Sequence, residues 1–79
     1  MRNVVLYSRP GCHLCDEARG VITSVRARQP FGFDEIDIET DDALLREYGI
    51  RIPVVTIDGE ERFEIAVDRD ELEGLVRLP

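Results

Sequence analysis

The 79-residue sequence contains no run of about 18 apolar residues, the length that a helix needs to cross a bilayer. Its first residues, MRNVVLYS, also lack the long apolar region and the small-residue cleavage site of a signal peptide. We therefore expect no membrane association and a cytoplasmic location. The 43% hydrophobic content is enough for one modest core, so we expect a single domain spanning residues 1–79.

Lysine is also absent, so arginine supplies all ten basic side chains, against 17 acidic ones. The resulting net charge of −7 argues against nucleic-acid binding, because neutralising phosphates requires a cationic surface. The negative charge favours solubility and basic surfaces on partners. We draw no function from the preference for arginine, which a GC-rich genome would explain.

Only two cysteines are present, Cys12 and Cys15, and they lie three positions apart. A secreted scaffold held together by disulfides needs more cysteines, spread more widely along the chain. Two thiols this close together cannot join distant parts of a fold. We therefore expect them to serve local chemistry.

The pattern of apolar residues in the first half of the chain predicts two strands around a helix. The near-continuous apolar run 3–8 is typical of a central strand buried on both faces. Apolar residues, beginning with Leu14, then recur at helical spacing over 12–28, and Pro30 ends this helix. Segment 31–39 alternates isoleucines with acidic residues on the other face, as a peripheral strand does.

A second helix follows in the middle of the chain. Thr40 is a natural N-cap for it, and Gly49 is well placed just beyond its end. Its apolar stripe consists of Leu44, Leu45 and Tyr48.

The last third of the sequence predicts a hairpin and a third helix. A strand is expected over 54–57, and Asp58-Gly59 predicts a tight turn into a further strand at about 61–66. Asp68 forms a capping box that begins the last helix. The residues of this helix that face the core are Leu72, Leu75 and Val76.

The predicted element order is therefore β-α-β-α-β-β-α. Its first half requires a right-handed crossover between two parallel strands, and the hairpin adds two antiparallel ones. This order is that of the minimal thioredoxin fold, an α/β fold in which three helices flank a four-stranded mixed sheet.

Two motifs make a resemblance specific. The stretch 7–16, YSRPGCHLCD, resembles the active-site turn of glutaredoxin-like proteins, in which C-x-x-C lies between the first strand and the first helix. The Ile52-Pro53 pair resembles a second mark of that family, an X-Pro bond that opens the third strand and is held cis beside the cysteines. The resemblance covers essentially the whole chain. It implies a thiol–disulfide oxidoreductase of the thioredoxin superfamily that serves cell redox homeostasis.

The physical chemistry of the motif supports this expectation independently. A thiolate is the attacking species in disulfide exchange, and the N-terminus of a helix favours negative charge. Cys12 is expected at that terminus, where free N–H groups can point towards its sulfur. Cys15 lies almost one turn later, on the side shared with Ala18 and Ile22, so it should be more buried and less ionised. We expect Cys12 to attack a substrate disulfide and Cys15 to resolve the mixed disulfide.

Five further residues are candidates for substrate binding. If Pro53 is cis, it would present the backbone of Ile52 to an extended substrate segment; otherwise it simply starts a strand. Arg9 and Arg51 flank the two loops, where they could attract the carboxylates of an anionic thiol or simply be solvated. His13 is either a cation or proton donor beside the first thiol, or an exposed residue that only tunes the redox potential. Many family members carry proline at that position.

One departure from the family concerns glutathione. Glutathione-using glutaredoxins have a Gly-Gly pair after the fourth strand, followed by an acidic residue that receives the amino end of the tripeptide. Here segment 63–68 reads FEIAVD, which lacks the glycines but keeps Asp68. Close approach of backbone to ligand is what those glycines allow. We therefore expect Asp68 to act as a helix cap, and a protein or another small thiol is an alternative to glutathione.

The sequence also leads to expectations about oligomeric state, cofactors and partners. We expect a monomer without a tightly bound cofactor, acting on a disulfide-containing protein or a small-molecule thiol. Glutathione or an analogue, or a reductase, would supply the electrons. A zinc site is not expected, because Cys12, His13 and Cys15 offer at most three ligands. Two alternatives stay open: a redox-sensing interaction module, and a dimer that shares an iron–sulfur cluster through Cys12.

Overall fold

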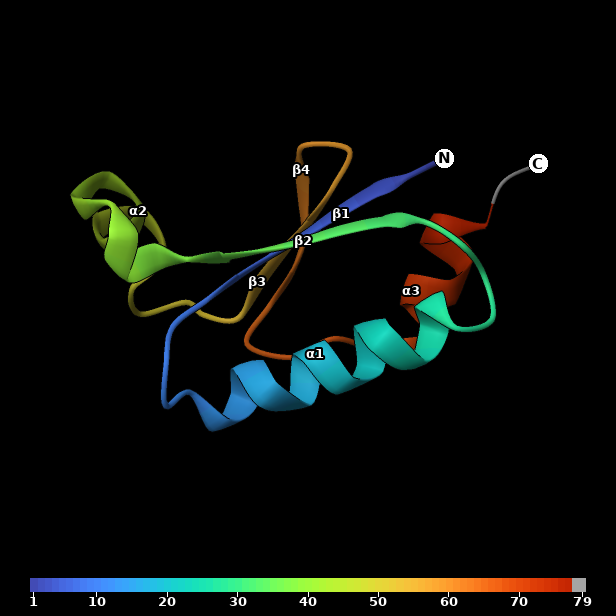
Figure 1. Cartoon of the computed structure of the whole chain (residues 1–79), viewed down its shortest axis with the longest axis horizontal. Coiled ribbons are helices and arrows are strands. Elements are labelled where there is room, and N and C mark those ends of the chain that lie inside the picture. Colours follow the sequence, from blue (N-terminus) through green and yellow to red (C-terminus); the bar gives the residue numbers. More distant parts are fainter. Residues whose placement is uncertain (78–79) are drawn as a thin grey trace.

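A four-stranded sheet in the order β2-β1-β3-β4 carries the other elements of the protein (Figure 1). The computed structural model describes residues 1–77, so the last two residues of the expected 1–79 domain lie outside the described part. In chain order the elements are β1 (Asn3–Ser8), α1 (His13–Arg26), β2 (Gly32–Asp37), the 3-10 helix η1 (Ile38–Thr40), α2 (Asp42–Tyr48), β3 (Val54–Ile57), β4 (Glu60–Glu64) and α3 (Arg69–Val76). The predicted element order, with a mixed sheet and three α-helices, is confirmed.

The pairing of the strands brings the two sequence motifs together. β1 pairs in parallel with β2 and antiparallel with β3, and β3 pairs antiparallel with β4. Tyr7 near the end of β1 lies opposite Val54 at the start of β3. The C-terminal end of β1 and the N-terminal end of β3 therefore lie next to each other, at the same end of the strands. The turn that follows Ser8 and the loop that precedes Val54 therefore lie at the same end of the molecule.

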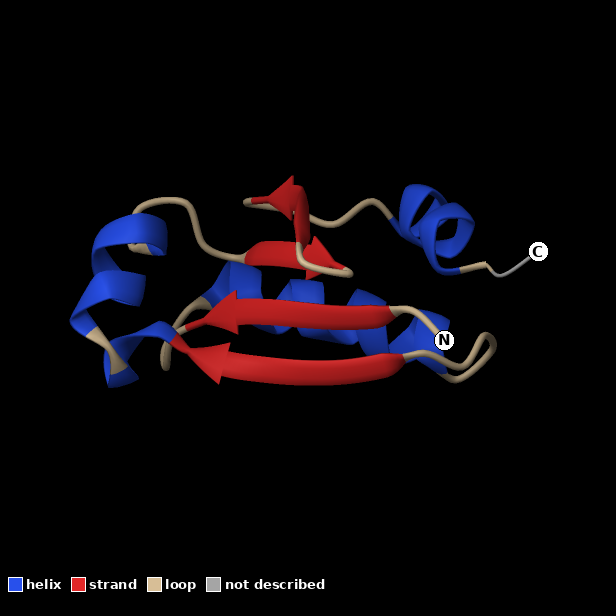
Figure 2. Ribbon diagram, turned by 90° about the horizontal axis from the view of Figure 1, so that it is seen from above, coloured by secondary structure: helices blue, strands red, loops and turns tan. Residues whose placement is uncertain are grey.

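The core lies on one face of the sheet, because α1 and α3 both pack on that face (Figure 1). The prediction that 3–8 is buried on both faces is correct for one face only: Val4, Leu6 and Ser8 are buried, whereas Val5 and Tyr7 are half-buried. The second face is less covered because α2 lies towards the ends of the strands rather than across them (Figure 2). The buried core consists of Val4, Leu6, Ala18, Ile22, Val25, Phe31, Val55, Ile57, Leu72 and Val76.

Helix α1 is shorter than the predicted 12–28. Cys12 is its N-cap rather than its first residue, and Ala27 is its C-cap. The buried stripe of the helix consists of Cys15, Ala18, Ile22 and Val25. Leu14, which was expected on the apolar face, lies at the border of this stripe and is 44% exposed.

Helix α2 differs from the prediction at both ends. Asp41 caps it by accepting a hydrogen bond from the N–H of Ala43 at 2.7 Å, whereas Thr40 belongs to η1. Asparagine, aspartate, serine and threonine compete closely as caps, so a choice between adjacent candidates depends on the fold. Gly49 continues with right-handed backbone at φ −50° instead of the left-handed conformation expected beyond a helix end. No residue of α2 is fully buried, so its predicted apolar stripe is only partly covered.

The hairpin and the last helix follow the prediction closely. Asp58 and Gly59 have φ values of 53° and 84°, as a type I′ turn between two strands requires. β4 ends at Glu64, two residues earlier than expected. The Asp68 carboxylate caps α3 by accepting the N–H of Glu71 at 2.8 Å, as predicted. None of the helices within residues 1–77 is long and apolar enough to cross a membrane.

Candidate active site

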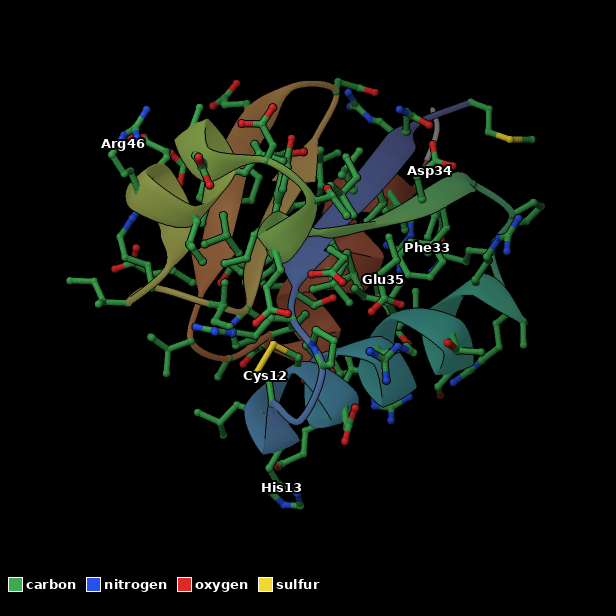
Figure 3. The ribbon with its side chains drawn as sticks, turned by 60° about the vertical axis from the view of Figure 1, so that its left-hand side comes forward. Cys12, His13, Phe33, Asp34, Glu35 and Arg46 are labelled. Atoms are coloured by element: carbon green, nitrogen blue, oxygen red, sulfur yellow. A yellow bond between two sulfur atoms is a disulfide. The ribbon has the colours of Figure 1, made fainter. Side chains whose placement is uncertain are left out.

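Cys12 closes the turn that connects β1 to α1 (Figure 3). The turn passes through Gly11 at φ +79°, in the left-handed region that favours glycine. Cys12 then adopts extended backbone as the N-cap of α1, and its Sγ accepts a hydrogen bond from the N–H of Cys15 at 3.1 Å. A donor N–H and the positive end of the helix at this sulfur favour its thiolate when the pair is reduced.

Cys12 and Cys15 form a disulfide, and their Cα atoms are 5.2 Å apart. This separation lies within the usual range for a disulfide. Cys15 is fully buried against the core side of α1, whereas Cys12 is only half-buried, as the sequence predicted. A sulfur atom of a substrate can therefore reach Cys12 from solvent and cannot reach Cys15.

The loop before β3 lies beside this turn. The Ile52–Pro53 peptide bond is cis, as the resemblance to glutaredoxin-like proteins implied, and Pro53 is buried. The carbonyl of Pro53 accepts a hydrogen bond from the N–H of Ile65 at 2.8 Å, which fixes the loop to the segment that follows β4. Ile52 is half-buried and lies outside the strand, so its backbone is at the edge of the site.

His13 points away from the protein and from the disulfide (Figure 3). Its side chain is 87% exposed, and its Nε2 lies 3.4 Å from a carboxylate oxygen of Glu17 one turn further along α1. Of the two predicted roles, the exposed residue fits this position better. Within residues 1–77, His, Cys, Asp and Glu side chains form no group of three or more that could hold a metal ion.

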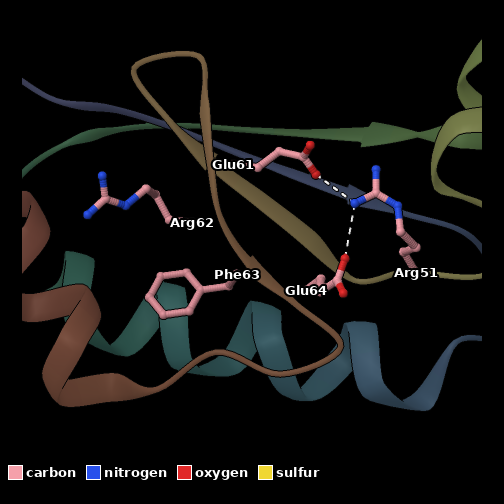
Figure 4. A pocket seen from close by; sticks show the side chains of 5 residues that line it. All are labelled: Arg51, Glu61, Arg62, Phe63 and Glu64. Atoms are coloured by element: carbon pink, nitrogen blue, oxygen red, sulfur yellow. Dashed lines mark hydrogen bonds and ion pairs between the residues drawn. The ribbon is translucent and has the colours of Figure 1, made fainter.

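Arg9 and Arg51 are both held by carboxylates of this chain. Nε and Nη2 of Arg9 donate to Glu39 at 3.1 and 2.7 Å. Nη1 of Arg51 donates to Glu61 at 2.9 Å and to Glu64 at 3.0 Å (Figure 4). These hydrogen bonds raise the pKa of Arg51, so its guanidinium stays protonated. An anionic substrate would have to compete with these carboxylates for either guanidinium.

Arg51 also connects α2 to the sheet. Its guanidinium lies over the ring of Tyr48, 5.3 Å from the centroid, and Tyr48 stacks on Tyr7 with ring centroids 4.4 Å apart. Burial and nearby Tyr7 raise the pKa of Tyr48. The shallow depression of about 330 Å³ along β4 is lined by Arg51, Glu61, Arg62, Phe63 and Glu64 (Figure 4). The arginines of this surface pair with glutamates of the same chain, Arg51 with Glu61 and Glu64 and Arg62 with Glu60.

The family model of the glutaredoxin-like domain (DUF836) matches residues 3–77, which is nearly the whole chain. The chain belongs to this family.

Solved structures agree with this assignment. Protein XcR50 from X. campestris is 30% identical over 91% of this chain and 92% of its own, with a TM-score of 0.76. Protein Ne2328 from Nitrosomonas europaea is 28% identical over 96% of this chain and 92% of its own, with a TM-score of 0.82. Mitochondrial thioredoxin 3 from Saccharomyces cerevisiae, 16% identical over 95% of this chain and 76% of its own, shares the fold with a TM-score of 0.69. No curated protein matches the sequence.

The sequence did not reveal the conformation of Ile65, the residue that follows β4 in this glutaredoxin-like domain. Its φ is +72°, and the N–H of Ala66 donates to the carbonyl of Glu64 at 2.8 Å, so 64–66 form a γ-turn centred on Ile65. For a β-branched residue this conformation is a true outlier, and such strain costs about 1–3 kcal/mol. The segment FEIA contains no glycine or asparagine, so no local signal marks the turn.

A polar cluster at the start of α1 was also missed. Glu35 accepts hydrogen bonds from Ser8 Oγ and from Arg19 Nε, each at 2.7 Å, and Arg19 also donates to Asp16 at 2.8 Å. The hydrogen bond from Arg19 lowers the pKa of Glu35 and raises the pKa of Arg19. The alternation in 31–39 had placed Glu35 on the face opposite the isoleucines; this face is turned towards α1, and Glu35 reaches Arg19 while it remains exposed. In this glutaredoxin-like domain the cluster ties the helix that carries the cysteines to β2.

Proposed function

We propose that this glutaredoxin-like domain is a thiol–disulfide oxidoreductase that reduces substrate disulfides, with Cys12 as the nucleophile and Cys15 as the resolving thiol. The observation that carries the proposal is the unequal pair: a half-buried Cys12 whose sulfur accepts an N–H at the start of α1, within disulfide reach of a fully buried Cys15. A structural disulfide has no need of this asymmetry.

The electron balance of the reaction is that of dithiol exchange. The Cys12 thiolate attacks one sulfur of the substrate disulfide, forms a mixed disulfide and expels the other sulfur as a thiolate, which takes up a proton. Cys15 then loses its proton, attacks the Cys12 sulfur and releases the second substrate thiol. The substrate gains two electrons and two protons, and the protein ends as the Cys12–Cys15 disulfide. Two equivalents of a low-molecular-weight thiol, such as glutathione or an analogue, or a dithiol reductase, would restore the reduced form.

The loop of Ile52 and Pro53 is proposed to hold the substrate. Its position next to the C-terminal end of β1 supports pairing between the backbone of Ile52 and an extended substrate segment. The ion pairs of Arg9 and Arg51 support a role in positioning the two loops. We propose that the domain works as a monomer in a reducing compartment such as the cytoplasm, since two thiols suffice for this chemistry without a bound cofactor.

The test uses a single turnover, followed by a multiple-turnover assay. Pre-reduced wild-type protein, Cys12→Ser and Cys15→Ser are mixed with a protein disulfide and, separately, with a glutathione mixed disulfide. We expect Cys12→Ser to fall to the uncatalysed rate. Cys15→Ser should stop after one step and accumulate one covalent substrate adduct per chain, measured by mass spectrometry. Comparing the two substrates identifies the thiol partner.

The alternative of a redox-sensing module predicts a different result. A sensor would be oxidised once. With dithiothreitol supplied as the reductant, it would not accelerate reduction of the substrate disulfide over many cycles. Wild-type rates with Cys12→Ser, or no acceleration by the wild-type protein, would rule out the proposed catalysis.

A further inference from the structure

A small apolar groove lies between α1 and the γ-turn that follows β4. Leu14, Ala18 and Val21 form one wall and segment 65–67 forms the other, with a volume of about 110 Å³. An apolar cavity of about 150 Å³ holds one benzene, and sites for small-molecule ligands measure about 300–1,000 Å³. The groove therefore has room for one aliphatic side chain and is too small for a whole small-molecule ligand.

Both walls of the groove are fixed to the proposed site. Leu14 lies between the two cysteines in the sequence, and Ile65 is held to the carbonyl of Pro53 by its N–H at 2.8 Å. These two side chains are 44% and 43% exposed, so both walls of the groove present apolar surface to solvent. A side chain that enters the groove would cover both of them beside the disulfide.

The strained backbone at Ile65 also indicates that the groove is a binding site. Sparsely populated conformations cluster at binding sites, where they are part of the function. Burial in the free protein does not account for this one, because Ile65 remains substantially exposed. Covering Ile65 with a partner side chain would remove the remaining apolar surface from water.

The charged residues around the groove indicate which charge a bound partner segment should carry. Glu17 lines it, and Glu64 and Asp68 stand immediately before and after its second wall. Three basic groups also lie near the groove: His13 pairs with Glu17, Arg51 pairs with Glu64, and Arg69, next to Asp68, donates to Ser24 of α1, while the chain as a whole has a net charge of −7. The excess negative charge of the chain attracts a cationic segment and repels an anionic one.

We infer that the groove is a recognition subsite for an aliphatic side chain next to a cysteine in a protein disulfide, within a segment that carries arginine or lysine. The inference rests on the proposed function and names its substrate class. Glutathione has no aliphatic side chain of this kind and carries carboxylates, so it neither fills the groove nor complements the charge of the chain. Ile65 is the residue that determines this specificity.

The kinetic test compares disulfide-linked dimers of short peptides that carry leucine or alanine beside the cysteine, flanked by arginine or by glutamate. With the wild-type protein we expect kcat/KM to be about tenfold higher for leucine than for alanine. Arginine flanks should be favoured over glutamate flanks, and added salt should weaken that preference. Ile65→Gly, which suits the positive φ, should reduce the leucine-to-alanine ratio to near one. Leu45→Ala, an exposed leucine on α2 outside the groove, should leave the ratio unchanged.

A binding measurement separates this inference from the proposed catalysis. In Cys12→Ser/Cys15→Ser protein, NMR amide shifts are followed during titration with the leucine–arginine peptide, in which serine replaces cysteine. Shifts centred on Leu14 and segment 65–67, and weaker for the alanine peptide, support the groove even if no turnover is found. Equal shifts for both peptides, no shifts at these residues, or an equal loss of the kinetic ratio in Leu45→Ala would overturn it.

Discussion

Cys12 and Cys15 both carry a thiol but lie in different surroundings, and this difference suits the two thiols to different roles. The sulfur of Cys12 accepts a hydrogen bond from the N–H of Cys15 and Cys12 is partly exposed, whereas Cys15 lies in the apolar stripe of α1. A helix that begins at Cys12 creates both environments at once, because the first turn exposes free N–H groups and residue 15 turns inward. The proposed roles follow from these surroundings.

The conformation of Ile65 leads to a prediction about stability. Ala and Gly both remove the side chain beyond Cβ, but only Gly adopts φ +72° without strain. We therefore expect Ile65→Gly to exceed Ile65→Ala in unfolding free energy by about 1 kcal/mol, the reverse of the order at ordinary positions. Urea denaturation measures both, and an Ala variant as stable as the Gly variant would show that the turn relaxes without Ile65.

At the scale of elements, the caps decide where helices begin. Asp68 was correctly identified because an acidic residue stands three positions later and an apolar stripe follows. Thr40 was not correct, because Asp41 beside it is an equally good cap and η1 extends through Thr40. The γ-turn lies just before α3, so the Asp68 cap also fixes where the chain leaves the groove.

Removing the cap should weaken α3 measurably. In Asp68→Ala, the N–H of Glu71 loses its carboxylate partner at 2.8 Å, and we expect a loss of about 1 kcal/mol in unfolding free energy. Asp70→Ala, in the first turn of the same helix, is the matched control and should cost less, since Asp70 acts only through the helix dipole. Thermal and urea unfolding of the two variants provide the comparison; equal losses would contradict the capping role.

At the scale of the whole molecule, ion pairs hold the loops of the site to the sheet. The cluster of Arg19, Glu35 and Ser8 joins α1 to β2 and β1, and Arg51 joins the loop before Pro53 to β4. Helix α2 buries no residue fully, and it is attached to the sheet by Tyr48, which stacks on Tyr7, and by Arg51, which contacts Tyr48 and β4. The helix that bears the cysteines is thus anchored by charge as well as by the core.

The Glu35 cluster predicts a dependence of stability on pH. The hydrogen bond from Arg19 lowers the pKa of Glu35 in the folded protein below the value of about 4.3 in the unfolded chain. The stability gained is therefore present above about pH 4.3 and is lost as the pH falls through the folded value. Between about pH 5 and pH 3, wild-type protein should lose more stability in urea than Glu35→Gln. Parallel losses would show that the carboxylate contributes nothing.

The sequence by itself determined the element order, the position of Cys12 and Cys15 at the start of a helix and the Asp68 cap, and its resemblance to glutaredoxin-like proteins implied the cis Pro53. These features depend on local patterns, namely helical and strand periodicity, punctuation by proline and glycine, and a motif with fixed spacing. The tertiary structure alone decided that Glu35 faces Arg19, that α2 leaves one sheet face half-covered, and that Ile65 forms a γ-turn with positive φ next to Pro53. Each of these depends on contacts between residues distant in sequence, where packing and charge pairing outweigh local preference.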